Sequence, residues 1–148
     1  MPRACSIARA LDILGEKWSL LVIRELLLGC HRFNEIQANT GAPRDILSDR
    51  LRTLVEHRVI ERVPYQQRPP RDEYHLTESG TALFGAITLL REWGDAYCGD
   101  PPIRFTHKCG HELETQLVCA HCGQPVTNRN VRRVVPGSMP GTLPANHQ

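Results

Sequence analysis

Residues 41–80, GAPRDILSDRLRTLVEHRVIERVPYQQRPPRDEYHLTESG, decide the fold together with the nine residues that precede them. Proline is favoured at the first position of a helix, so Ala42-Pro43 is predicted to open one. Apolar residues then recur at spacings of four, seven and eight positions and form a single stripe, made of Leu47, Leu51, Leu54 and Val55. The opposite face is polar, so this helix is predicted to pack on one side only.

A β-hairpin is predicted after this helix. Residues 59–65 approach the alternation of a strand, and residues 73–76 can return as its partner. The intervening QQRPPRD cannot be helical, because Pro69-Pro70 removes donors and biases the preceding residue toward extended geometry. Arg68 and Arg71 lie in this loop and make it cationic.

Three further helices are predicted before this stretch, over about residues 5–14, 17–28 and 32–39, with Gly15 and Gly29 as stops. Three helices followed by a two-stranded wing form the winged helix-turn-helix plan, in which the second helix of the pair enters the major groove. We therefore expect a mainly α fold with a small β wing.

The polar helix face and the hairpin tip supply the candidate DNA contacts. Arginine reads guanine through paired acceptors, and cationic wing residues follow phosphates or enter the minor groove. The candidates are Arg32, Arg44, Asp45, Ser48, Arg52, Arg68 and Arg71. The competing interpretation is a solvated helix face, which is credible for Arg52 and Glu56 because they lie four residues apart.

Thr77 is a plausible N-cap for a helix that continues to about residue 97. Its apolar positions recur at helical spacing, at Leu83, Ile87, Leu90 and Trp93. Such a stripe packs either on its own domain or on a second copy of the chain. We expect a partner surface.

Bulk composition constrains the function only weakly. The chain has 148 residues and a formal net charge of +2, so the placement of charge has to carry any argument for nucleic-acid binding. No apolar run approaches the roughly 18 residues of a membrane span, and we expect a cytoplasmic protein without a membrane partner. Six cysteines in such a chain argue against a disulfide scaffold.

Several separate motifs together resemble the HxlR-type branch of MarR-like transcriptional regulators. They are Cys5, GEKWSLLVIRELLLG at 15–29, HRFNEI at 31–36, ILSDRLRTLVEHRVIERV at 46–63, PPRDEYHLTESG at 69–80 and REWG at 91–94. The resemblance spans about residues 5–95. It implies a homodimer whose terminal helices pack across a twofold axis, binding to double-stranded DNA at an inverted repeat, and control of a nearby gene.

The resemblance also gives Cys5 a candidate role, since members of this family often use a cysteine before the first helix as a redox or electrophile sensor. The nearby Arg3 and Arg9, and the start of a helix, favour a thiolate. The alternative is an inert thiol. Cys30 and Cys98 are expected to fill space.

A Cys/His segment follows Gly99-Asp100-Pro101-Pro102, which breaks the chain. Three thiolates and one imidazole can complete a tetrahedral zinc site, and zinc can stabilise a segment too short for its own core. The predicted ligands are His107, Cys109, Cys119 and Cys122, with His111 as a second candidate for the fourth position. A CxxC redox pair, free thiols, or a ribbon that has lost its metal are the alternatives.

The sequence thus predicts a winged helix-turn-helix domain over 1–98, a small β zinc-ribbon-like segment over 99–135 and a disordered tail over 136–148. The predicted function is a non-enzymatic, sequence-specific DNA-binding regulator, a homodimeric repressor that responds to a thiol modifier or small ligand. The alternatives are a zinc-ribbon adaptor that uses the winged helix for protein contact, and a thiol oxidoreductase that uses Cys119 and Cys122.

Overall fold

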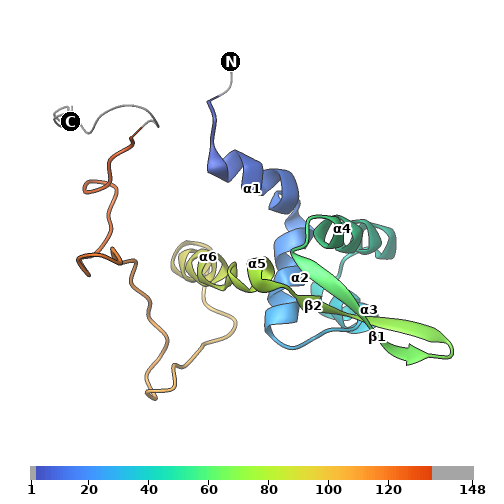
Figure 1. Cartoon of the computed structure of the whole chain (residues 1–148). Helices are drawn as coiled ribbons and strands as arrows, with labels where there is room; N and C mark the ends of the chain where they lie inside the picture. Colours follow the sequence, from blue (N-terminus) through green and yellow to red (C-terminus); the bar gives the residue numbers. More distant parts are fainter. Residues whose placement is uncertain (1–2, 135–148) are drawn as a thin grey trace. The chain divides into compact units, whose positions relative to one another are not determined.

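The computed structural model describes residues 3–134 (Figure 1). Six helices and one antiparallel hairpin follow one another along this part of the chain. The elements are α1 Ser6–Leu14, α2 Lys17–Leu27, α3 Phe33–Thr40, α4 Arg44–Glu56, β1 Ile60–Gln67, β2 Pro70–Leu76, α5 Glu78–Thr81 and α6 Phe84–Tyr97. The chain divides into two compact units between Pro102 and Ile103, shortly after the predicted boundary. The predicted disordered tail lies outside the described residues.

Helix α2 is the centre of the first unit, and it contacts α1, α3, α4, α6 and β2. Its inward side chains Val22, Ile23 and Leu26 are buried. The predicted stripe of α4 packs in the same core, with Leu47, Leu51 and Leu54 fully or almost fully buried. Each such side chain contributes about 1.5–3 kcal/mol on leaving water. The helical spacing in the sequence therefore predicted the buried face of α4 correctly.

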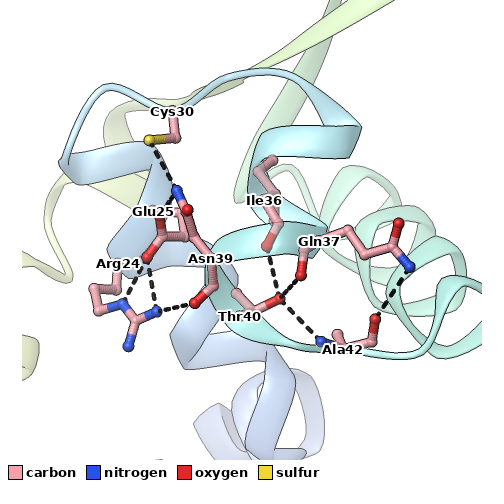
Figure 2. A network of polar contacts seen from close by, with 8 residues as sticks. All are labelled: Arg24, Glu25, Cys30, Ile36, Gln37, Asn39, Thr40 and Ala42. Atoms are coloured by element: carbon pink, nitrogen blue, oxygen red, sulfur yellow. Dashed lines mark hydrogen bonds and ion pairs between the residues drawn. The ribbon is translucent and has the colours of Figure 1, made fainter.

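The turn between α3 and α4 is fixed by hydrogen bonds from its own residues (Figure 2). Gly41 has φ +73°, a left-handed conformation that suits glycine at a helix C-terminus. The Thr40 hydroxyl donates to the Ile36 carbonyl at 2.7 Å, and the Ala42 amide donates to the same hydroxyl at 3.2 Å. The orientation of α4 relative to α3 is thus set locally.

A buried carboxylate joins α3 to α2. Glu25 is only 3% exposed, yet Arg24 pairs with it at 2.7 Å and the Asn39 side chain donates to it at 2.8 Å. The same Asn39 amide donates to the Cys30 sulfur at 3.4 Å (Figure 2). Burial, followed by the Glu25 charge, raises the pKa of the Cys30 thiol. Cys30 is therefore a structural thiol and a poor nucleophile.

The wing is longer than the sequence predicted. Pairing runs from Ile60 opposite Leu76 to Gln67 opposite Pro70, with an irregularity between Pro64 and Gln66. Most of the predicted loop 66–72 is therefore strand, and only Arg68-Pro69 forms the tip. A proline is tolerated here because Pro70 is the first residue of its strand.

The base of the wing is tied to the start of α3. Arg32 forms a β-bridge with Glu73, and the Tyr74 amide donates to the His31 carbonyl at 2.8 Å. The imidazole of His31 bonds the Tyr74 carbonyl at 2.9 Å and stacks on His75, with ring centroids 4.1 Å apart. Residues 31–32 thus pair with β2 through an isolated bridge and the bonds between His31 and Tyr74. The sequence did not predict this pairing.

The predicted helix from Thr77 to about residue 97 is divided into α5 and α6, with Ala82 and Leu83 between them. Thr77 does cap α5, since its hydroxyl accepts the Gly80 amide at 3.4 Å. That hydroxyl also donates to the Arg58 carbonyl at 2.6 Å. The start of α5 therefore docks on the connection between α4 and β1.

Gly80 allows this docking. A Cβ at this position would lie 2.2 Å from the Val59 carbonyl oxygen and 2.9 Å from a methyl of Leu76. Gly85, also helical, has nothing within 4 Å of the equivalent point. A side chain is thus excluded at Gly80 and tolerated at Gly85.

The second unit contains no strand within residues 103–134. Two isolated bridges, Thr106 with Glu112 and Val118 with Pro125, are formed instead. The prediction of a small β zinc-ribbon-like segment is therefore not supported at the level of strands within these residues. In residues 3–134 no helix is long and apolar enough to cross a membrane.

We predict that Gly80→Ala lowers the free energy of unfolding by about 1–3 kcal/mol, the cost of inserting a methyl group into a well-packed contact. Gly85→Ala is the matched control, and it is expected to be neutral or stabilising by up to about 1 kcal/mol. Denaturant unfolding followed by circular dichroism measures both. Equal effects of the two substitutions would contradict the packing role of Gly80.

Candidate nucleic-acid interface

The outward face of α4 is exposed along its length. Asp45, Ser48 and Asp49 lie opposite the buried stripe and point to solvent. Ser48 can bond a base or a phosphate, and a carboxylate such as Asp45 can accept from the cytosine amino group. The face is thus suited to base recognition but not to attraction by charge.

Arg44 is held at the start of α4 by side chains of α3. Its guanidinium lies over the Phe33 ring, 4.7 Å from the centroid. It donates to the Asn34 and Gln37 side-chain oxygens at 3.4 and 3.3 Å. An arginine held in this way loses less conformational freedom when it binds a planar or anionic group.

Arg32 is held between the helices and the wing. Its guanidinium lies 4.2 Å from the Tyr65 ring centroid and pairs with Glu73 at 3.3 Å. The hydrogen bond from His75, at 3.1 Å, is the main cause that lowers the pKa of Glu73, and Arg32 adds to it. This carboxylate therefore stays charged and keeps Arg32 in place.

Arg62 is a further candidate interface residue, which the sequence did not indicate. It pairs with Asp72 across the hairpin at 2.7 Å and lies over the Tyr74 ring at 5.9 Å. The pairing register places it opposite Tyr74, and the lining of the hollow described below shows that this face of the wing turns toward the starts of α3 and α4. Cross-strand pairing is not readable from one strand alone.

The arginines gather around one hollow. It has a volume of about 530 Å³ and lies between the starts of α3 and α4 and the wing. Arg32, Arg44, Arg62 and Arg71 line it together with the rings of Phe33, Tyr65 and Tyr74 and the carboxylates of Glu35 and Asp72. Its basic side chains outnumber its acidic ones, so it favours an anionic ligand.

The remaining predicted contacts fall into two kinds. Arg52 forms an ion pair with Asp49 one turn earlier, so its charge is compensated on the helix surface by a partner other than the expected Glu56. Arg68 and Arg71 are exposed at or beside the wing tip, and within residues 3–134 neither guanidinium forms an ion pair. Their charge is available to a phosphate.

Cys5 is the N-cap residue of α1, and it is exposed. The Arg9 amide donates to the Cys5 carbonyl at 3.2 Å, whereas the Arg9 guanidinium donates to the Ser6 hydroxyl at 3.2 Å. The predicted proximity of Arg9 to Cys5 is thus present in the backbone, but the guanidinium bonds a different side chain.

The four predicted zinc ligands lie in two turns of the second unit. Amides of Cys122 and His121 point at the Cys119 sulfur and lower the pKa of this thiol. The six cysteines are free. Within residues 3–134 no three His, Cys, Asp or Glu side chains are grouped so as to hold a metal ion. The structure therefore does not bring His107, Cys109, Cys119 and Cys122 together, and the zinc site stays a prediction.

The first unit has the architecture of a winged helix-turn-helix protein. Residues 13–101 match the family described as HxlR-like helix-turn-helix. The chain belongs to this family.

Relatives and solved structures agree with this assignment. Rv3095 of Mycobacterium tuberculosis, an uncharacterised HTH-type transcriptional regulator, is 48% identical over 130 residues, which cover 85% of this chain and 82% of that protein. The crystal structure of PA1607, described as a candidate transcription factor, has a TM-score of 0.78 and 34% identity, over 88% of this chain and 94% of that one. The reduced redox regulator HypR has a TM-score of 0.57 and 30% identity, over 62% and 92%.

The chain is therefore a DNA-binding transcriptional regulator, as the sequence predicted, and its family is one of regulators and not of enzymes. The matches to Rv3095 and PA1607 cover more of this chain than residues 13–101, the region that matches the HxlR-like family.

We predict that Arg68→Ala with Arg71→Ala weakens duplex binding to a similar degree for all sequences. The slope of log K against log salt concentration should become shallower by about one for each phosphate that the wing no longer neutralises. Arg104→Ala with Arg129→Ala removes the same charge from exposed positions of the second unit and is the control. Fluorescence anisotropy over a salt series measures both pairs. An unchanged slope in the wing variant would make the wing a surface for protein contact.

Proposed function

We propose that the protein represses transcription as a homodimer that binds an inverted repeat. One observation carries the proposal: the residue that caps α3 (Arg32), the start of α4 (Arg44) and the wing (Arg62 and Arg71) all place basic side chains at a single hollow. This hollow lies at the start of α4, whose outward face is exposed. A duplex that places its major groove on α4 brings a phosphate strand to this hollow and to the wing tip. Arg44 and Ser48 would read base edges, while Arg32, Arg62, Arg68 and Arg71 would position the backbone.

Helix α6 supports the dimer. Leu90, Trp93 and Tyr97 lie at spacings of three and four on one face, and they are 53%, 58% and 75% exposed. The expected stripe is in fact divided, because Leu83 and Ile87 pack on the core of their own unit. The outer half is an apolar surface of the kind that a second copy covers.

Helix α1 points to the same conclusion. It has no buried residue, and its apolar side chains Ile7 and Leu11 are 70% and 54% exposed. A nine-residue helix is marginal on its own in water, so packing has to stabilise it. A twofold dimer through α1 and α6 would provide that packing and would hold two α4 helices for half-sites about one helical turn apart.

We predict that Leu90→Ala with Trp93→Ala converts the dimer to a monomer and weakens binding to the full inverted repeat by about 100-fold or more, because avidity is lost. Binding to an isolated half-site should change little. The operator itself can be selected from a random duplex pool, and light scattering reports the mass in solution.

Leu28→Ala is the control for this pair, since Leu28 is an equally exposed leucine (58%) at the end of α2. A monomeric wild-type protein, or selection of single unrepeated sites, would refute the proposed dimer.

We also propose that Cys5 transmits an oxidative signal to the dimer. The thiol is exposed at the start of α1, beside the surface that the dimer would use, and the structural relative HypR is described as a redox regulator. Transfer of a peroxide oxygen to the sulfur gives a sulfenic acid and releases water, and a second thiol can then form a disulfide with loss of another water. Either product alters the start of α1. Because α1 belongs to the proposed dimer surface, this changes the distance between the two α4 helices of the dimer.

We predict that hydrogen peroxide weakens operator binding by wild type and leaves binding by Cys5→Ser unchanged. Cys98→Ser, which removes another exposed thiol, should respond as wild type does. Gel-shift titration before and after addition of a reductant measures the effect and its reversal. The same response in all three proteins would exclude Cys5 from the mechanism.

A further inference from the structure

The second unit lacks a core of its own within the described residues. No side chain in residues 103–134 is buried, and the half-buried ones are Phe105, Leu113, Thr115, Cys119 and Val126. Chains of this length usually need a disulfide, a metal or a partner subunit to fold. Because all the cysteines here are free thiols, the question is what stabilises the fold of this segment.

The segment contains a turn closed by three backbone hydrogen bonds around Cys119. The Val126 amide donates to the Leu117 carbonyl at 2.7 Å, the Cys119 amide to the Gln124 carbonyl at 2.9 Å, and the Gly123 amide to the Cys119 carbonyl at 2.7 Å. Gly123 has φ +72°, which reverses the chain directly after Cys122. Cys119 and Cys122 are thereby held on one tight turn.

The same pattern occurs once before, around His107. The Leu113 amide donates to the Phe105 carbonyl at 2.7 Å, the His107 amide to the His111 carbonyl at 2.9 Å, and the Gly110 amide to the His107 carbonyl at 2.8 Å. Gly110 has φ +90° and directly follows Cys109. The first turn is therefore a copy of the second, one residue shorter between its first donor and its glycine.

This repeat assigns a counterpart to each donor. His107 takes the position of Cys119, and Cys109, which precedes the glycine, takes the position of Cys122. The Cys109 amide donates to the His107 Nδ1 atom at 3.3 Å, as the amides of Cys122 and His121 do to the Cys119 sulfur. His111 corresponds to Gln124, which follows the glycine, and His121 lies in the extra length of the second turn.

We propose that the two turns form the halves of one structural zinc site, with His107, Cys109, Cys119 and Cys122 as its four ligands. Three thiolates and one imidazole are a donor set that zinc takes in tetrahedral sites. Within residues 103–134 the turns are formed but their donors are not gathered into one group. Binding of the ion thus draws the two preformed turns together and links them, which replaces the missing core.

The site is structural and not catalytic. Four protein ligands fill a tetrahedral shell and leave no position for water or substrate. The proposal is independent of how the first unit binds DNA, since it rests on residues 103–134 alone.

The test is metal analysis of the full-length chain purified without chelator. Wild type is expected to hold about one zinc per chain, and Cys119→Ser to hold almost none. His107→Ala should also lose the metal, whereas His111→Ala should keep it. This pair is decisive, because the two histidines flank the same turn and differ only in their place in the repeat.

His107→Cys keeps the proposal testable if His107→Ala misfolds, because a four-thiolate site should again bind about one zinc. Cobalt in place of zinc adds a spectroscopic readout: tetrahedral visible bands and a thiolate charge-transfer band, the latter more intense in His107→Cys. Helicity by circular dichroism confirms that the first unit is folded in each variant.

Two results would overturn the proposal. Wild type with no zinc and titratable or disulfide-bonded cysteines would exclude the metal. Loss of zinc in His111→Ala with retention in His107→Ala would show that the two turns are not equivalent halves.

Discussion

The burial of one face of α4 against α2 is the constraint on which the DNA-binding surface depends. Leu47, Leu51 and Leu54 leave water on the same side of the helix, and this fixes the rotation of α4 about its own axis. The opposite face must then be exposed, because a helix with a single apolar stripe can bury that stripe in only one orientation. A hydrogen bond from the Asn39 side chain to the buried Glu25 attaches α3 to α2 as well (Figure 2). Helices α3 and α4 are therefore both held against α2.

Placement of charge, rather than its total, distinguishes this surface. The chain has a net charge of only +2, and two arginines of the hollow, Arg32 and Arg62, are partly neutralised by Glu73 and Asp72. These ion pairs are exposed and contribute little to stability. Their effect, together with the stacking of Arg32 on Tyr65 and Arg44 on Phe33, is to hold guanidinium groups in place before a ligand arrives. Each stacking contact is worth about 0.5–1 kcal/mol at an exposed site.

The sequence predicted the parts of the fold that depend on local pattern. The spacing of Leu47, Leu51 and Leu54 gave the buried face of α4, and Thr77 was recognised as a cap because capping uses the residue's own hydroxyl. The position of Arg62 at the hollow, the bridge between Arg32 and Glu73 and the division of the stripe on α6 were missed. Each depends on which distant segment lies opposite, and one strand or helix read alone does not contain that information. For the predicted metal ligands the sequence already favoured His107 over His111, because His107-x-Cys109-Gly imitates the Cys-Gly ending of the later turn. The backbone hydrogen bonds add that His107 and Cys119 occupy matching positions in two similar turns.

The helices and the wing that form the DNA-binding surface have little freedom to change conformation relative to one another. The wing is tied to α3 by the bridge between Arg32 and Glu73 and by the pairing of His31 with Tyr74, while α5 is docked on Val59 with no room for a side chain at Gly80. The elements with weak support are α1, which has no fully buried residue and packs on the core only at its end, through Ile13 and Leu14, and the outer face of α6. In the proposed dimer these two helices set the distance between the two DNA-binding surfaces. A signal at Cys5 would therefore change the distance between the two α4 helices of the dimer without altering the structure of either helix. This is sufficient to regulate binding, because two rigid DNA-binding domains match an inverted repeat at one spacing only.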